Sequence, residues 1–201
     1  MSSSDSNAPP SRRSSSDWEW KLREAVERLR TRYDHIGRKT GAPFLAIVYS
    51  PEIERSLLRE WHTIAATLEP ELSVRTIDVL QVTERVVQQF GAAALVDSMN
   101  EPMPGSDPTS ELGAMWTSAV ATSVREAAAK RGSGRPVVVL ERLAALYPAS
   151  GPRAVMQTLW DSDHAALEGP VVLLVPGVLV EARVYSFVGR VEEFMYRGDI
   201  L

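Results

Sequence analysis

Three short, nearly continuous apolar runs constrain the fold more than any other feature of the sequence. They cover residues 44–49, 136–141 and 169–176, and apolar and polar residues do not alternate within them. A strand with one face in water shows such alternation, whereas a strand covered by helices on both faces stays apolar throughout. The runs therefore predict buried strands of a parallel sheet.

Segments with helical periodicity lie between these strands. The expected helices cover residues 17–34, 51–68, 83–96 (with Gly91 inside it), 112–130 and 152–160, and two further strands are expected at 74–79 and 180–188. A surface loop is expected at 97–107, where prolines and a glycine stand among polar residues. The repeated strand and helix order predicts an α/β fold: an open, mostly parallel, doubly wound sheet, Rossmann-like or degenerate P-loop-like, with helices on both faces.

The length of 201 residues suits a single domain. Residues 1–16 are rich in serine and are expected to form a disordered tail. Residues 17–201 are expected to form one α/β domain with an N-terminal amphipathic helix and a C-terminal docking tail. The chain has no cysteine, which excludes disulfides and thiolate metal sites. Because the lack of cysteine gives no support to an oxidising compartment, the sequence indicates a cytoplasmic protein. No apolar run approaches the ~20 residues that span a membrane, so no membrane-spanning segment is expected.

The turn after the first strand is where an open α/β sheet usually binds a nucleotide. A phosphate site there needs glycines and free backbone amides, but the sequence is Tyr49-Ser50-Pro51-Glu52, with a proline and a carboxylate. The glycine-flanked segment 37–41 precedes the strand and lacks the P-loop spacing. The turn therefore predicts no phosphate cradle, and no cofactor is expected.

Two acidic residues at strand ends are the candidates for a nucleotide site. Glu141 follows the apolar run at the position where a P-loop ATPase carries its acidic residue, and Asp78 lies near the end of the preceding strand. The alternative for both is a solvated residue or a cap of the following turn. No catalytic or metal site is predicted, because the sequence has no Gly-x-Ser-x-Gly motif and its histidines, His35, His62 and His164, lack the spacing of a helical zinc site.

Nucleic-acid binding has one candidate cluster, formed by Lys130, Arg131 and Arg135. The formal net charge is −4, so broad attraction to DNA is not expected. A solvated helix end is the alternative interpretation of these basic residues.

The C-terminal segment combines apolar, aromatic and charged residues. Phe194, Met195, Tyr196 and Arg197 are candidate contacts for a partner, and docking of the segment on its own domain is the alternative. Trp20 lies off the apolar stripe of the first helix and is a further candidate contact.

Four pieces of sequence carry a family resemblance: residues 43–49, residues 139–148 followed by Leu159, residues 170–177, and the aromatic and basic segment around 194–197. In these pieces and their order the chain resembles the B component, BrxB, of the BREX bacteriophage-defence systems. The resemblance implies a non-catalytic adaptor or scaffold in a bacterial anti-phage complex. It implies that the partners are an ATPase, a phosphatase-like chain or a DNA methyltransferase. A divergent nucleotide-binding or DNA-contacting accessory protein of the same system is the alternative.

Overall fold

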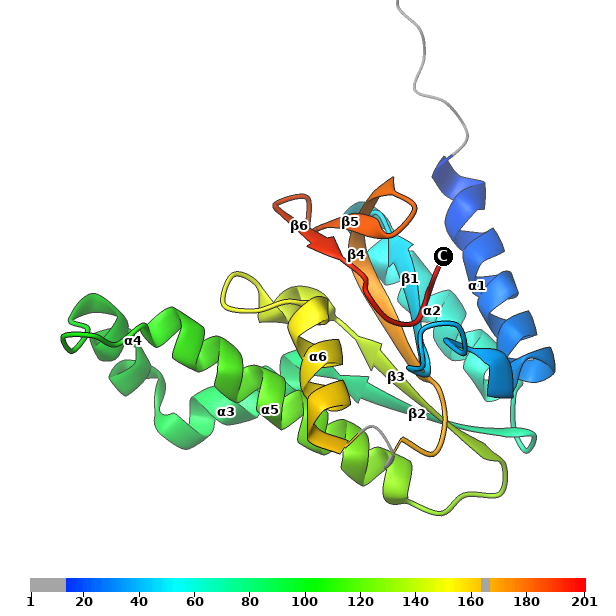
Figure 1. Ribbon diagram of the computed structural model, residues 1–201, viewed down its shortest axis with the longest axis horizontal. Helices are drawn as coiled ribbons and strands as arrows, with labels where there is room; N and C mark the ends of the chain where they lie inside the picture. The colour runs from blue at the N-terminus through cyan, green and yellow to red at the C-terminus, as the bar shows by residue number, and fades with distance from the viewer. Residues whose placement is uncertain (1–13, 164–166) are drawn as a thin grey trace, which may run out of the picture.

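The computed structural model describes residues 14–163 and 167–201, and its centre is an open parallel sheet (Figure 1). The order of the parallel strands is β2-β3-β4-β1-β7. Their bounds are Leu72–Asp78 for β2, Arg135–Glu141 for β3, Val171–Glu181 for β4, Phe44–Tyr49 for β1 and Asp199–Ile200 for β7. The fold is therefore α/β with a mostly parallel sheet, as the apolar runs predict.

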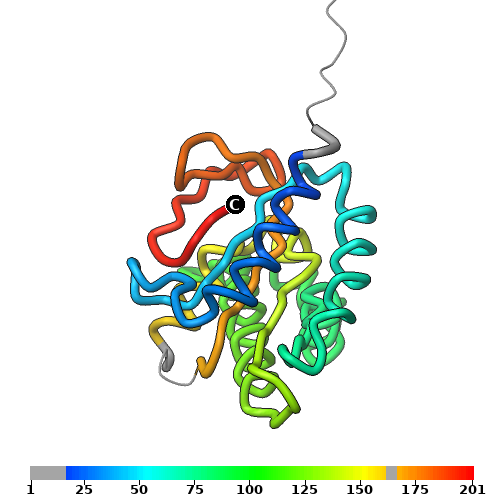
Figure 2. Tube along the Cα trace, turned by 90° about the vertical axis from the view of Figure 1, so that its right-hand side faces the viewer, coloured from blue at the N-terminus to red at the C-terminus, as the bar shows by residue number. Residues whose placement is uncertain are grey.

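Helices cover both faces of this sheet. One face carries α1 (Ser14–Thr31) and α2 (Glu54–Ala66), and Figure 2 looks onto the side of α1. The opposite face carries α3 (Val79–Phe90), α5 (Pro108–Ala129) and α6 (Pro152–Asp163). Alternate residues of β1 enter the two cores, with Leu45 and Ile47 toward α1 and α2, and Ala46 and Val48 toward the other helices. Burial on both faces is why the sequence of this strand shows no alternation.

The expected helix over 83–96 is wrong, because the chain breaks at Gly91. This glycine has φ +86°, a left-handed value that an α-helix does not contain. α3 ends at Phe90, and a separate helix, α4 (Ala92–Asn100), follows. The loop expected from residue 97 therefore begins only after Asn100.

The N-terminal boundary also differs from expectation. α1 begins at Ser14, so three of the residues assigned to the serine-rich tail belong to the helix. Residues 1–13 lie outside the described residues. Short 3-10 helices complete the fold; their bounds are Tyr33–His35 for η1, Pro51–Ile53 for η2 and Leu143–Leu146 for η3.

The expected last strand over 180–188 is wrong. β4 continues to Glu181, the chain turns at Ala182 and Arg183, and β5 (Val184–Phe187) returns antiparallel to it. β6 (Val191–Phe194) then pairs with β5, and together they extend the end of β4 into a small antiparallel sheet. After β6 the chain crosses to the free edge of β1 and pairs with it as β7. The C-terminal segment is thus part of the fold.

Candidate functional site

The carboxyl edge of the sheet, where the parallel strands end, is the first place to examine for a ligand. After β1, the Pro51–Ile53 turn is a 3-10 helix with Glu52 in it, and the Ser50 hydroxyl donates a hydrogen bond to the Glu52 carboxylate. Tyr49 donates its hydroxyl hydrogen to Glu54 Oε1 at 2.8 Å. Burial, and then the Glu54 carboxylate, raise the pKa of Tyr49 above its usual range. Two carboxylates and a proline therefore stand where a phosphate cradle would require free amides.

A lysine that the sequence did not single out also lies at this edge. Lys21 reaches from α1 and donates through Nζ to the carbonyl oxygen of Val48 at 2.9 Å. The same Nζ is 3.2 Å from Asp17 Oδ2. Lys21 lines a hollow of about 380 Å³ between α1, the end of β1 and the beginning of the β4 extension. Its charge is already balanced by groups of this chain.

Glu141 and Asp78, the candidates for a nucleotide site, are neighbours at the ends of β3 and β2. Glu141 is only 5% exposed, and its Oε2 lies 2.7 Å from His62 Nε2 on α2. Asp78 caps α3 by accepting from two backbone amides, and its Oδ2 lies 3.0 Å from Arg142 Nη1. Each carboxylate thus has a partner within the chain.

No sequence pattern predicts that His62 pairs with Glu141, because 79 positions separate the two residues and only the packing of α2 over β3 brings them together. Of the other histidines, His35 is exposed at the end of the 3-10 helix η1, and His164 is outside the described residues. In the part of the chain that the structure describes, no three histidine or acidic side chains come together as a metal site.

The residues of the basic cluster expected for nucleic acid differ in their surroundings. The Arg135 guanidinium stacks on the Tyr33 ring, 4.4 Å from its centroid, and lies 3.5 Å from the Glu71 carboxylate. Lys130 lines a separate groove along β2 and α5, which also contains Asp78 and Glu126. Arg131 is exposed at the end of α5. All three side chains are exposed, and Arg135 is the one whose partners within the chain are shown.

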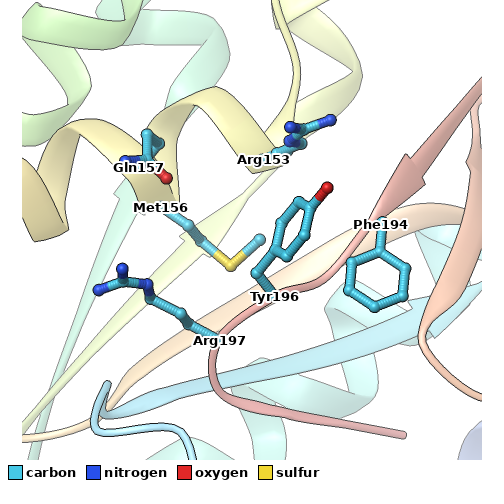
Figure 3. A pocket seen from close by; sticks show the side chains of 6 residues that line it. All are labelled: Arg153, Met156, Gln157, Phe194, Tyr196 and Arg197. Atoms are coloured by element: carbon cyan, nitrogen blue, oxygen red, sulfur yellow. The ribbon is translucent and has the colours of Figure 1, made fainter.

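The C-terminal candidates Phe194, Tyr196 and Arg197 lie against α6 (Figure 3). Together with Arg153 of that helix they form a surface that we call the tail surface. The Phe194 and Tyr196 rings meet edge to face with their centroids 4.5 Å apart. The Arg153 guanidinium lies 5.0 Å from the centroid of the Tyr196 ring. Tyr196 is nevertheless 61% exposed, so this surface presents aromatic and cationic groups to solvent.

Two of the sequence candidates are engaged within the chain. Met195 is fully buried, so its expected role as a partner contact is wrong for this conformation: its side chain belongs to the core. Arg197 stacks on the Trp160 ring of α6 at 4.0 Å. Trp20 is 51% exposed on α1, on a different element from the tail surface.

The comparisons with known proteins identify no relative. No protein-family model matches the chain, and neither a curated protein nor a solved structure is significantly similar to it. Within the described residues, none of the helices has the length and apolar character needed to cross a bilayer.

Proposed function

We propose that this protein is a non-catalytic adaptor of a bacterial anti-phage defence system of the BREX type, and that it acts through protein–protein contacts. The observation that carries the proposal is the pairing of the charged side chains at the carboxyl edge of the sheet. At the end of β1, Glu52, Glu54 and Lys21 lie around the usual phosphate position, and each is already bonded within the chain. In a fold that often serves nucleotide chemistry, this position thus carries two carboxylates and a lysine that is already paired with Asp17.

The tail surface supports the same proposal. Aromatic and arginine side chains are the groups that most often carry binding energy at protein interfaces. Here Phe194, Tyr196 and Arg153 lie together in solvent, on β6, the residues after it, and α6. The cavity among them is about 20 Å³, room for about one water molecule. The surface therefore suits a partner protein better than a small ligand.

The first test is co-purification from the native operon. We expect the tagged chain to recover an ATPase, phosphatase-like or methyltransferase subunit at moderate salt. The double substitution Phe194→Ala and Tyr196→Ala is expected to lower the recovery at least about tenfold, because losing an interface hot spot costs about 2 kcal/mol. Leu80→Ala is the control, since Leu80 is a similarly exposed apolar residue on α3. Recovery of the chain alone in mild salt would reject the adaptor proposal.

A divergent nucleotide binder is the second candidate function. The Glu141 and His62 pair favours it, because it places an acid and a base at the end of β3. β4 lies between β1 and β3, so the ends of β1 and β3 are about 10 Å apart, a gap that a phosphate with its metal ion can bridge.

Thermal unfolding with millimolar ATP and magnesium separates the two candidates. A ligand present at about 100 times its Kd stabilises the folded state by about 2.7 kcal/mol, which raises Tm by roughly 5–10 °C in a domain of this size. We expect no shift. A shift that Glu141→Gln abolishes, and that the matched surface change Glu84→Gln leaves in place, would establish the nucleotide binder instead.

A further inference from the structure

The end of α3, α4 and the first half of α5 form a helical arm that projects away from the sheet (Figure 1). α5 is 22 residues long, about 33 Å at 1.5 Å per residue, and α4 lies at its outer end beside the end of α3. The buried residues of α5 include Val120 and Val124 in its second half, which pack on the sheet core. No residue of α4 is buried. α4 therefore contributes no buried side chain to the core of the domain.

Four large apolar side chains are exposed at this outer end. Phe90, Val96, Met99 and Met103, which we call the arm patch, are between 41% and 77% exposed. Within α4, Ala92, Val96 and Met99 follow one another at positions i, i+4 and i+7, so they share one face of the helix. Leu95 is only half-buried. A contiguous apolar face in water is costly in a monomer and marks a surface that a partner covers.

The charge of the arm narrows the choice of partner. Between Arg85 and Arg125 the sequence contains Asp97, Glu101, Asp107 and Glu111 but no Lys, Arg or His. All four carboxylates are exposed, and none forms an ion pair among the described residues. The rest of the chain has equal numbers of acidic and basic residues, so the arm holds the whole net charge of −4.

We propose that the arm patch docks into an apolar groove on a partner protein and that lysine or arginine side chains rim this groove. The apolar residues supply the area removed from water, and the carboxylates of Asp97 and Glu101 pair with the basic rim and speed the encounter. This inference deepens the proposed adaptor function and rests on it, since it adds a second contact far from the tail surface.

The charge of the arm also argues against a second copy of the chain, nucleic acid or an anionic membrane as the partner that covers the arm patch. A second copy of the chain would bring four carboxylates against four more, with no cation in either arm to offset them. The phosphates of nucleic acid and the surface of an anionic bilayer would be repelled for the same reason.

Site-specific photo-crosslinking tests the proposal in cells that express the native operon. A photoreactive amino acid replaces Met99 on α4, and in the control it replaces Arg55, an exposed residue of α2 on the body of the protein. We expect Met99, and not Arg55, to crosslink to a protein whose joined peptide, sequenced by mass spectrometry, carries apolar residues flanked by Lys or Arg. A crosslink to a second copy, to lipid, to nucleic acid or to a peptide without basic residues, or no crosslink, would overturn the proposal.

A variant pair measures the same contact without the crosslinker. Val96→Asp with Met99→Asp places charge on the exposed face, where it does not disturb the core, and is expected to reduce partner recovery at least about tenfold. The double substitution Asp97→Lys and Glu101→Lys is also expected to reduce partner recovery, because it places cations against the basic rim of the groove. The reduction is expected to be largest at low salt, where charges are least screened. If a partner co-purifies equally with wild type and with both variants, the arm inference fails while the adaptor proposal stands. If no partner co-purifies and no crosslink forms, both fail.

Discussion

Met195→Ala is expected to lower the free energy of unfolding by about 2–5 kcal/mol, the range for truncating a buried methionine. Met195 is fully buried in the core that lies between the sheet and α6. Its backbone is also fixed, because Met195 N donates to the carbonyl of Arg183 at 2.8 Å and Arg183 Nε donates to the carbonyl of Met195 at 2.8 Å. The site therefore has little freedom to collapse around a smaller side chain.

The neighbouring substitution Tyr196→Ala is the matched control. Tyr196 is mostly in solvent, and its contact with Arg153 contributes about 0.5–1 kcal/mol at most. We expect a loss below about 1 kcal/mol. Urea unfolding followed by tryptophan fluorescence measures both variants, with equal m-values as the condition for comparing them. Equal, small losses for both residues would mean that the C-terminal segment is not part of the core.

Glu193 is the second position where a large effect is expected. Its Oε2 accepts hydrogen bonds from the Tyr185 hydroxyl at 2.6 Å and from the backbone amide of Arg153 at 3.0 Å, in the first turn of α6. Glu193→Ala removes the acceptor for both donors, and Tyr185 is fully buried. A buried donor left without a partner costs about 1–3 kcal/mol. Glu193→Gln keeps an acceptor oxygen, so the alanine variant is expected to be less stable than the glutamine variant by about this amount.

The pH dependence distinguishes the charge of Glu193 from its hydrogen bonds. Burial raises the pKa of this carboxyl above its ordinary value of 4.5, and the bonds from Tyr185 and Arg153 offset only part of that rise. A raised pKa means that the folded state favours the protonated carboxyl of Glu193. Its contribution to the free energy of unfolding is therefore complete below about pH 4.5 and is lost as the pH rises through the pKa of the folded state. Glutamine does not titrate and has no such loss.

The stability of Glu193→Gln relative to wild type is therefore expected to increase from about pH 4.5 to about pH 8. Urea unfolding of both proteins at the two pH values checks this, and the difference between the proteins cancels the titration of all other groups. A constant difference across this range would show that Glu193 has the same pKa in the folded and unfolded chains.

The sequence by itself determined the parallel sheet, because the relevant signal is local. Residues 44–49 are apolar at every position, and such a run is compatible with a strand only if both of its faces are covered. The proline and the acidic residues after this strand are also visible without tertiary information, and the structure places Pro51 and Glu52 in the 3-10 helix that follows β1. Local pattern was insufficient at Gly91, where helical spacing continues on both sides but the backbone turns to positive φ.

The tertiary structure alone decided which distant residues meet. Glu141 and His62 pair only because α2 packs over β3, and Lys21 reaches the end of β1 only because α1 crosses that face. The sequence left two alternatives for the C-terminal segment: docking on its own domain, or contact with a partner. The structure divides them residue by residue: Met195 enters the core, while Phe194 and Tyr196 on either side of it stay in solvent. The physical reason is that a strand and its continuation point successive side chains in opposite directions, and only the fold determines which direction is inside.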